Sequence, residues 1–238
     1  VRGLNAASVL AGRYNPNGKF IRAWNPECVE EGEDCTGWII VDSMMNIPLL
    51  YWAGQITGDP RFQQIAVNHA DTVASYLVRE DGSCGHIACI NPDTGELEHI
   101  LGGQGYSETS SWSRGQSWIL YGFALSYRHT KIKNIWTLPK KQPLLYLQYC
   151  TDRLYPSVRF QTAGLCRYTD TSAGLCAACG LLELQSMWMS VKKIFTAPMQ
   201  NSSSNIPLKP AVTGIPIQMG LYRTVRWHFT MTAGNRRI

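Results

Sequence analysis

A single carboxylate, Asp42, lies within an otherwise apolar run from Val41 to Ala53. Apolar surroundings disfavour the charged form of a carboxylic acid, so an acid in such a place can keep its proton near neutral pH and donate it to a substrate. The alternative is an ordinary helix in which Asp42 caps an end or pairs with a cation at the surface, since structural pairs also perturb carboxylates. The run therefore predicts a candidate proton donor and leaves the structural alternative open.

A second group combines aromatic rings, an arginine and amides over a short stretch of chain. Its members are Gln104, Trp112, Arg114, Gln116 and Trp118. Aromatic faces stack on sugar rings, amides hydrogen-bond hydroxyls, and the arginine fork fits a carboxylate or sulfate. This set predicts a site for an acidic sugar. The alternative is a partly exposed start of an amphipathic helix, in which Arg114 pairs with Glu108.

Two further polar residues are less specific. His86 could contact a substrate or move a proton, although a lone histidine is more often a hydrogen-bonded structural group. Asp170 precedes Thr171 and Ser172 and is expected to cap the helix that follows. The sequence has no phosphate-binding glycine loop, no nucleophile elbow and no histidine pair at metal spacing. We therefore expect neither a cofactor nor a metal.

The elements that must position these residues are mostly helical. The run that contains Asp42 is expected to be a helix, kinked where Pro48 removes a backbone donor. Apolar residues at helical spacing predict a second helix over 60–79, which forms a helical hairpin with the first, and a later helix over 171–187. Proline-interrupted spacing predicts a weaker helix over 138–154.

The arginine and tryptophans are expected on a helix that begins near Ser110 or Ser111 and ends near Arg128. Gly115 and Gly122 share one face of this helix and would allow a neighbouring helix to approach closely. Between helices, the turn signal of residues 91–95 predicts a small β-hairpin over 86–97.

Composition limits the possible partners and surroundings. The chain has 238 residues, of which 45% are hydrophobic, without an apolar run long enough to span a membrane and without a signal-peptide pattern. We expect a cytoplasmic protein whose eight cysteines are reduced. All 17 acidic residues lie at or before Glu183, whereas seven of the 22 basic residues follow it, so the formal charges are 15 − 17 = −2 and +7. The basic tail lacks a dense cluster, so we expect no nucleic-acid partner.

Three motifs in one order carry a resemblance to a known family. They are the run from Val41 to Ala53, Gln104-Gly105-Tyr106 followed by Trp112-x-Arg114-Gly115-Gln116-x-Trp118, and Asp170-Thr171-Ser172-Ala173 followed by residues 177–184. Over about residues 3–185 the chain resembles the unsaturated glucuronyl hydrolases of glycoside hydrolase family 88.

The resemblance implies an all-α fold, an (α/α)6 barrel of six helical hairpins with its active site among the loops at one end. We expect residues 1–185 to form a partial barrel, incomplete at the N-terminus, and residues 186–238 to form a poorly matched basic tail. The chain starts at Val1 and has no counterpart of a second family aspartate, so we expect a truncated product. The oligomeric state is left open.

The resemblance also implies a reaction and its residues. The substrate would be an oligosaccharide that ends in a 4,5-unsaturated glucuronate. Asp42, as general acid and base, would protonate C4 of the vinyl ether while water adds at C5, and the resulting hemiketal would open. Because this is hydration of a double bond, the carboxylate spacing of ordinary glycosidases does not apply. The substrate contacts would come from His86, Gln104, Trp112, Arg114, Trp118 and Trp24.

Two other functions stay open at this point. A chain without the second aspartate could be a non-catalytic remnant that binds acidic carbohydrates. Alternatively, the basic tail could be a module for anionic polymers, in which case deletion of residues 186–238 would abolish binding.

Overall fold

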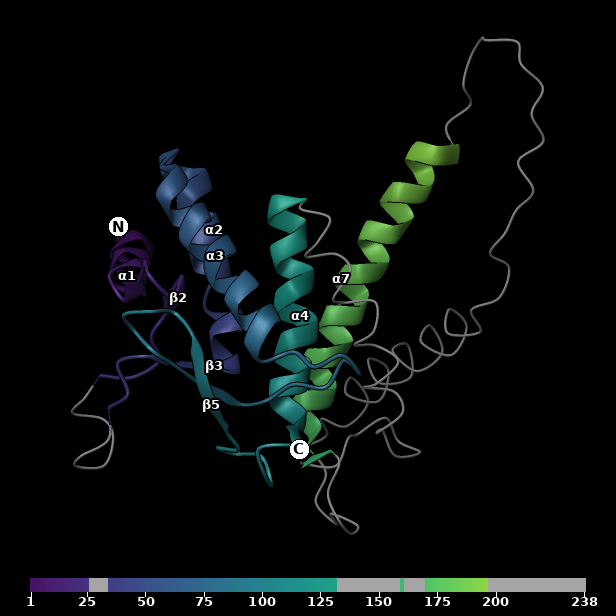
Figure 1. Ribbon diagram of the computed structural model, residues 1–238. Helices are drawn as coiled ribbons and strands as arrows, with labels where there is room; N and C mark the ends of the chain where they lie inside the picture. Colours follow the sequence, from purple (N-terminus) through teal and green to yellow (C-terminus); the bar gives the residue numbers. More distant parts are fainter. Residues whose placement is uncertain (26–33, 132–158, 161–169, 197–238) are drawn as a thin grey trace, which may run out of the picture. The chain divides into compact units, whose positions relative to one another are not determined.

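The computed structural model describes residues 1–25, 34–131, 159–160 and 170–196 (Figure 1). The helix expected over 138–154 lies outside the described residues, as does the tail from residue 197 onward. The chain divides into two compact units, Val1–Ser190 and Val191–Ile238, and apart from residues 191–196, which end a helix, everything below concerns the first of them. The domain division expected at residue 185 stays a prediction.

Helices make up most of the described chain. They are α1 (Arg2–Ala11), the short 3-10 helix η2 (Val41–Met45), α2 (Pro48–Thr57), α3 (Pro60–Tyr76), α4 (Ser113–Thr130) and α7 (Thr171–Thr196). The helix expected from residue 171 to residue 187 is confirmed at its start and continues to Thr196. Among the described residues, no helix is long and apolar enough to cross a membrane.

The predicted helical hairpin is formed by α2 and α3, which pack against each other. Gly58 ends α2 with a φ of 72°, a left-handed conformation that glycine adopts without strain. Asp59 then caps α3 by accepting a hydrogen bond from Arg61 N–H, and Pro60 occupies the first turn. Local residue chemistry therefore explains this connection fully.

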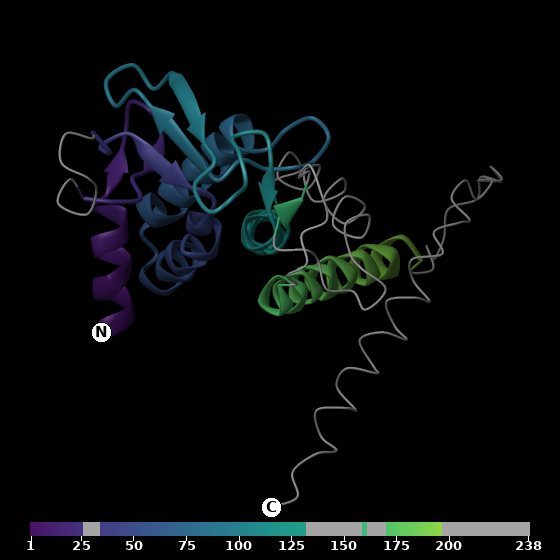
Figure 2. The same cartoon turned by 90° about the horizontal axis from the view of Figure 1, so that it is seen from below.

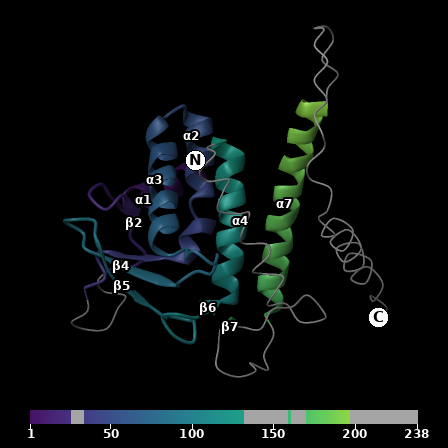
Figure 3. The same cartoon turned by 45° about the vertical axis from the view of Figure 1, so that its right-hand side comes forward.

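Three small antiparallel sheets accompany the helices, so the described chain is mostly helical rather than all-α. Strands β1 (Tyr14–Asn15) and β2 (Phe20–Ile21) pair, as do β6 (Ser111–Trp112) and β7 (Arg159–Phe160). The third sheet has the order β3-β4-β5, from β3 (Trp38–Ile40), β4 (Ile87–Ile90) and β5 (Leu97–Leu101). The hairpin β4-β5 confirms the prediction, whereas β3 is too short to give a recognisable pattern. This sheet lies across one end of α2, α3 and α4 (Figures 2 and 3).

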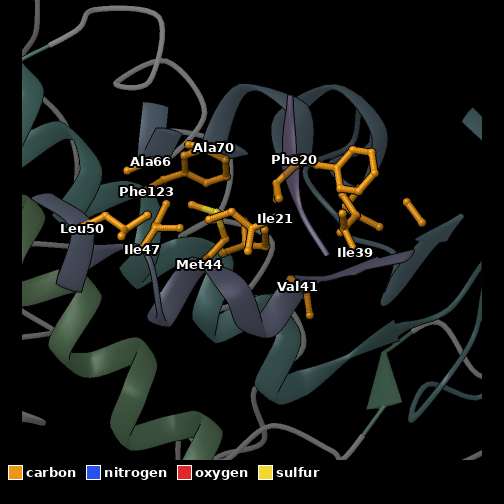
Figure 4. Packing of buried hydrophobic residues seen from close by; sticks show 14 of the residues in the cluster. Phe20, Ile21, Ile39, Val41, Met44, Ile47, Leu50, Ala66, Ala70 and Phe123 are labelled. Carbon is orange, nitrogen blue, oxygen red and sulfur yellow. The ribbon is translucent and has the colours of Figure 1, made fainter. Parts of the chain in front are cut away.

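The main core joins residues from the N-terminal strands, η2 and the helices. Figure 4 shows side chains of this cluster, among them Ile21 from β2, Met44 from η2, Ala70 from α3 and Phe123 from α4. A second, smaller cluster lies between α4 and α7, which run side by side (Figures 1 and 3), and contains Leu120 and Ala177. The core therefore holds η2 against long helices at the edge of the three-stranded sheet.

Candidate active site

Asp42 enters the site on η2, directly after β3 ends at Ile40. The continuous kinked helix expected here is not formed. Instead η2 ends at Met45, and Pro48 occupies the first turn of α2. Proline suits that position because the first N–H groups of a helix have no partner within it. The kink prediction was therefore wrong, and Pro48 starts a new helix.

Two glycines of α4 allow η2 to pack closely, as their spacing predicted. A Cβ atom on Gly115 would lie 2.9 Å from Val41 Cγ1, and one on Gly122 would lie 2.6 Å from Met44 Cβ. Both distances are shorter than packed carbon atoms tolerate. Val41 and Met44, on the buried side of η2, thus pack directly against glycines of α4.

The side chain of Asp42 is 33% exposed, so the apolar run buries this carboxylate only in part. A 3-10 helix has three residues per turn, which places Asp42 and Met45 on one face. Val41, Ser43 and Met44 are buried, and that face is the less buried one. Of the two oxygens, however, Asp42 Oδ2 is buried and has no hydrogen-bond partner among the described residues. Its neighbour is His86 Nε2, at 3.4 Å.

His86 is held in one tautomer by the loop before β6. The N–H of Gln104 donates to His86 Nδ1 at 2.9 Å, so this nitrogen is an acceptor without a proton. The proton of the neutral ring therefore lies on Nε2, which faces Asp42 Oδ2. Gly103, with a φ of 51°, is required here, because a Cβ atom at this position would collide with the His86 ring. Gln104 thus contributes its backbone to the site.

Trp112 connects His86 to the arginine. Its ring is buried, with its centroid 5.0 Å from that of His86 and 5.1 Å from that of Trp118, the latter at an edge-to-face angle of 85°. The guanidinium carbon of Arg114 lies 4.5 Å from the centroid of the Trp112 ring, a cation–π contact. Three of the predicted aromatic and cationic residues therefore form one contiguous group next to His86.

The start of α4 differs from the expected one. The helix begins at Ser113, after β6, and neither Ser110 nor Ser111 is its N-cap. Ser110 Oγ instead accepts hydrogen bonds from the N–H groups of Tyr106 and Ser107, and Ser111 Oγ donates to Gln116 Oε1. These serines order the loop that delivers Gln104 and Trp112, which sequence alone does not distinguish from capping.

Arg114 pairs with Asp170, at the start of α7. Its Nη1 donates to Asp170 Oδ2 at 2.7 Å, so the alternative in which Arg114 pairs with Glu108 was wrong. The arginine side chain is 37% exposed and the aspartate side chain only 3% exposed. Burial alone raises the pKa of the Asp170 carboxyl, but its hydrogen bonds and the charge of Arg114 outweigh burial and hold the pKa below its usual range.

Asp170 also caps α7, as predicted. Its Oδ1 accepts from Ala173 N–H at 3.0 Å and from Ser172 Oγ at 2.7 Å, while Oδ2 accepts from Ser113 Oγ at 3.0 Å in addition to Arg114. One carboxylate therefore both starts α7 and fixes the guanidinium on α4. The cap follows from the local sequence, whereas the partners of the ion pair are 56 residues apart and no local pattern predicts it.

The structure brings most of the predicted site residues together. Asp42, His86, Trp112, Arg114 and Trp118 are linked through the contacts above. Trp24 lies edge-to-face against Trp38 of β3, with ring centroids 6.1 Å apart. Its role in binding stays a prediction.

The comparisons identify the family. The chain belongs to Glycosyl Hydrolase Family 88, whose model matches residues 5–171. It is 37% identical over 186 residues to the unsaturated glucuronyl hydrolase of Bacillus sp. strain GL1, an alignment that covers 77% of this chain and 48% of that protein. It is 38% identical over 182 residues to the unsaturated chondroitin disaccharide hydrolase of Streptococcus agalactiae, covering 76% of this chain and 45% of that protein.

A solved structure of the unsaturated glucuronyl hydrolase from Bacillus sp. GL1 superimposes with a TM-score of 0.75 at 29% identity. The superposition covers 94% of this chain and 53% of that one. The chain therefore spans about half the length of the relatives that it matches.

Proposed function

We propose that this protein acts as a hydrolase that removes a 4,5-unsaturated glucuronate from the non-reducing end of an oligosaccharide by hydrating its double bond. The observation that carries the proposal is the position of Asp42 Oδ2, which is buried beside His86 Nε2 without a hydrogen-bond partner among the described residues. The fold thus holds Oδ2 beside His86 without satisfying it, and the rest of the side chain, which is 33% exposed, can meet a substrate. The names of the similar proteins point to the same class of substrate.

In the proposed reaction Asp42 transfers a proton to C4 of the unsaturated ring and then accepts one from the water that adds at C5. The product is a hemiketal, which opens and releases the remaining saccharide. The Nε2–H of His86 faces Asp42 and can donate to the carboxylate that forms when the proton has left.

Arg114 and the tryptophans are proposed to bind the uronate. Asp170 engages Nη1 of Arg114, and the guanidinium has further N–H groups for a substrate carboxylate. Trp112 and Trp118 would provide apolar faces for the ring, with Gln104 and Trp24 as further contacts. The expected ligand is thus anionic, cyclic and hydroxylated.

We further propose that the described helices are part of an (α/α)6 barrel, with residues 1–185 as its partial catalytic domain and residues 186–238 as a separate tail. The similarity to the Bacillus structure and the helical hairpin α2-α3 support this fold. Strands β3 and β4, which are distant in the sequence, pair with each other and so bring Asp42 and His86 close together. Such an arrangement is expected of a site among the loops at one end of a barrel.

The test is turnover of an unsaturated uronyl disaccharide, followed by the loss of ultraviolet absorbance of the double bond. The 238-residue chain is expected to show this loss, and Asp42→Asn is expected to lower the rate by at least about 100-fold while substrate still binds. Equal rates for both chains would contradict the role of Asp42. Binding in calorimetry without any change in absorbance would instead identify a non-catalytic protein that binds acidic carbohydrates.

A further inference from the structure

A buried histidine behind Asp42 is used by neither the proposed reaction nor substrate binding. His69, on α3, is completely buried and contacts two elements at once. The N–H of Ile21, in β2, donates to His69 Nδ1 at 3.0 Å. On the other side of the ring, His69 Nε2 lies 2.6 Å from Ser43 Oγ, in η2. Both ring nitrogens are therefore engaged.

The directions of these hydrogen bonds follow from the first one. Because Nδ1 accepts from a backbone N–H, the proton of the ring lies on Nε2, which donates to Ser43 Oγ. The hydroxyl of Ser43 in turn donates to the carbonyl of Ile40 at 2.6 Å. This series of hydrogen bonds connects Ile21 of β2, through the imidazole and Ser43, to Ile40, the last residue of β3. Burial lowers the pKa of His69 to about 3, so the ring keeps this single tautomer over the working range of most enzymes.

Ser43 forms hydrogen bonds with the backbone both before and after its own position. Its hydroxyl bonds to the residue that precedes η2, and its carbonyl accepts from the N–H groups of Asn46 and Ile47, at 2.9 and 3.0 Å. A 3-10 helix has weaker hydrogen-bond geometry than an α-helix and depends on its surroundings. Ser43 is the neighbour of Asp42, so any shift of this turn moves the carboxylate.

Other contacts support η2 from α4 and from the sheet. Val41 and Met44 pack onto the glycines of α4, and Val41 N–H donates to the carbonyl of His86 at 3.0 Å. These contacts fix the α4 side and the sheet side of the turn. The Ser43 hydroxyl connects η2 to α3 through a directional hydrogen bond. A core position that required only volume would take an apolar side chain, since a buried imidazole is costly without partners.

We propose that His69 is a positioning residue for Asp42: through Ser43 it fixes the first turn of η2 and so keeps Asp42 Oδ2 beside His86 and the exposed part of the carboxyl group open to a substrate. The inference rests on the proposed function for its consequence in turnover, whereas the fixing of η2 can be measured without any reaction.

Two amides separate the roles of the two ring nitrogens. In His69→Gln the side-chain amide nitrogen can occupy the place of Nε2 and donate to Ser43. In His69→Asn the amide oxygen can occupy the place of Nδ1 and accept from Ile21, but the side chain does not extend to Ser43. His99→Asn makes the same chemical change on the exposed strand β5 and serves as the control.

The first measurement is turnover of an unsaturated uronyl disaccharide by the 238-residue chain, with kcat and KM determined separately. His69→Asn is expected to lower kcat at least about tenfold with KM within about twofold, because misplacement of a reacting group by about 1 Å can cost about 100-fold in rate. His69→Gln is expected to recover most of that loss, and His99→Asn to match the unsubstituted chain. In an Asp42→Asn background, His69→Asn is expected to cause little further loss. Equal kcat values for His69→Asn and His69→Gln would overturn the proposal.

The second measurement is amide hydrogen exchange of Asn46 and Ile47, whose N–H groups bond to the carbonyl of Ser43. In His69→Asn these amides are expected to exchange at least about tenfold faster than in His69→Gln, with the amides of α4 unchanged. Equal exchange rates at η2 would overturn the positioning role even if the protein turns over its substrate. No turnover by the unsubstituted chain, with the exchange difference present, would contradict the proposed function alone.

Discussion

Two carboxylates of this protein differ in how far the fold satisfies them. Asp170 receives four hydrogen bonds, from Ser113, Arg114, Ser172 and Ala173, distributed over both oxygens. Asp42 has a buried Oδ2 without a hydrogen-bond partner among the described residues, although its side chain as a whole is more exposed than that of Asp170. The carboxylate that we propose as the reactive acid thus differs from Asp170 in the state of its hydrogen bonds rather than in greater burial of its side chain.

The surroundings of the two residues show the same difference. Asp170 lies where two helices meet and contributes an ion pair and a helix cap, both of which use the charged form. Asp42 is held by its backbone, through Ser43 and the packing onto Gly115 and Gly122, and its carboxyl group is left to face His86. We interpret the first carboxylate as structural and the second as the one prepared for a substrate.

Removal of the satisfied carboxylate is expected to have the largest effect on folding. Asp170→Ala deletes the cap of α7 and the ion pair with Arg114, and removes one acceptor of Ser113, so the free energy of unfolding should fall by about 2–4 kcal/mol. Urea denaturation measures this loss. Asp170→Ser can keep the cap without the ion pair, and a loss as large as that of the alanine variant would show that the cap contributes nothing.

Near Asp42, the second carboxylate of the comparison, Gly103→Ala should displace the His86 ring and so disturb the site. A Cβ atom at this position would collide with the imidazole and would also strain a φ of 51°. We expect the free energy of unfolding to fall by about 1–3 kcal/mol. We also expect turnover to fall, because the collision displaces the His86 ring from Asp42. Thermal unfolding and the absorbance assay test this. Gly58→Ala also has a positive φ, of 72°, with open space around the position, so it controls for backbone strain alone.

A smaller effect is expected from the histidine behind Asp42. Burial lowers the pKa of His69 to about 3 in the folded chain, whereas the unfolded chain has the ordinary value near 6.5. Between these pH values the unfolded state binds a proton that the folded state does not. The free energy of unfolding should therefore be complete above pH 6.5 and fall by up to about 1.4 kcal/mol per pH unit below it.

Urea denaturation between pH 4 and pH 8 measures this slope. Comparison of the unsubstituted chain with His69→Gln isolates the contribution of one histidine, because glutamine does not titrate. If both chains lost stability in parallel over this range, the slope would have to come from other groups.

The sequence predicted those parts of the structure that depend on local residue chemistry. Gly58, Asp59 and Pro60 define the α2-α3 turn, the turn signal at residues 91–95 defines the β4-β5 hairpin, and the spacing of two glycines marked the face of α4 that receives η2. The contiguous group around Trp112 was also predicted, since four of its residues come from two short motifs.

The remaining features depend on partners that are distant in the sequence. Arg114 and Asp170 are 56 residues apart, and Ile21 and His69 are 48 residues apart. No periodicity links such residues, so the ion pair and the buried histidine were missed. The helix expected around Asp42 was assigned from apolar composition alone, which does not distinguish a 3-10 turn followed by a new helix from one kinked helix.

The most direct test of the account compares Asp42→Asn with Asp170→Asn in two assays on the same preparations. We expect Asp42→Asn to keep the melting temperature of the unsubstituted chain and to lose the absorbance change of an unsaturated uronyl disaccharide. Asp170→Asn should lower the melting temperature, because an amide nitrogen cannot accept from Arg114. If Asp42→Asn melted early and kept its turnover, Asp42 would be the structural carboxylate and the account would be contradicted.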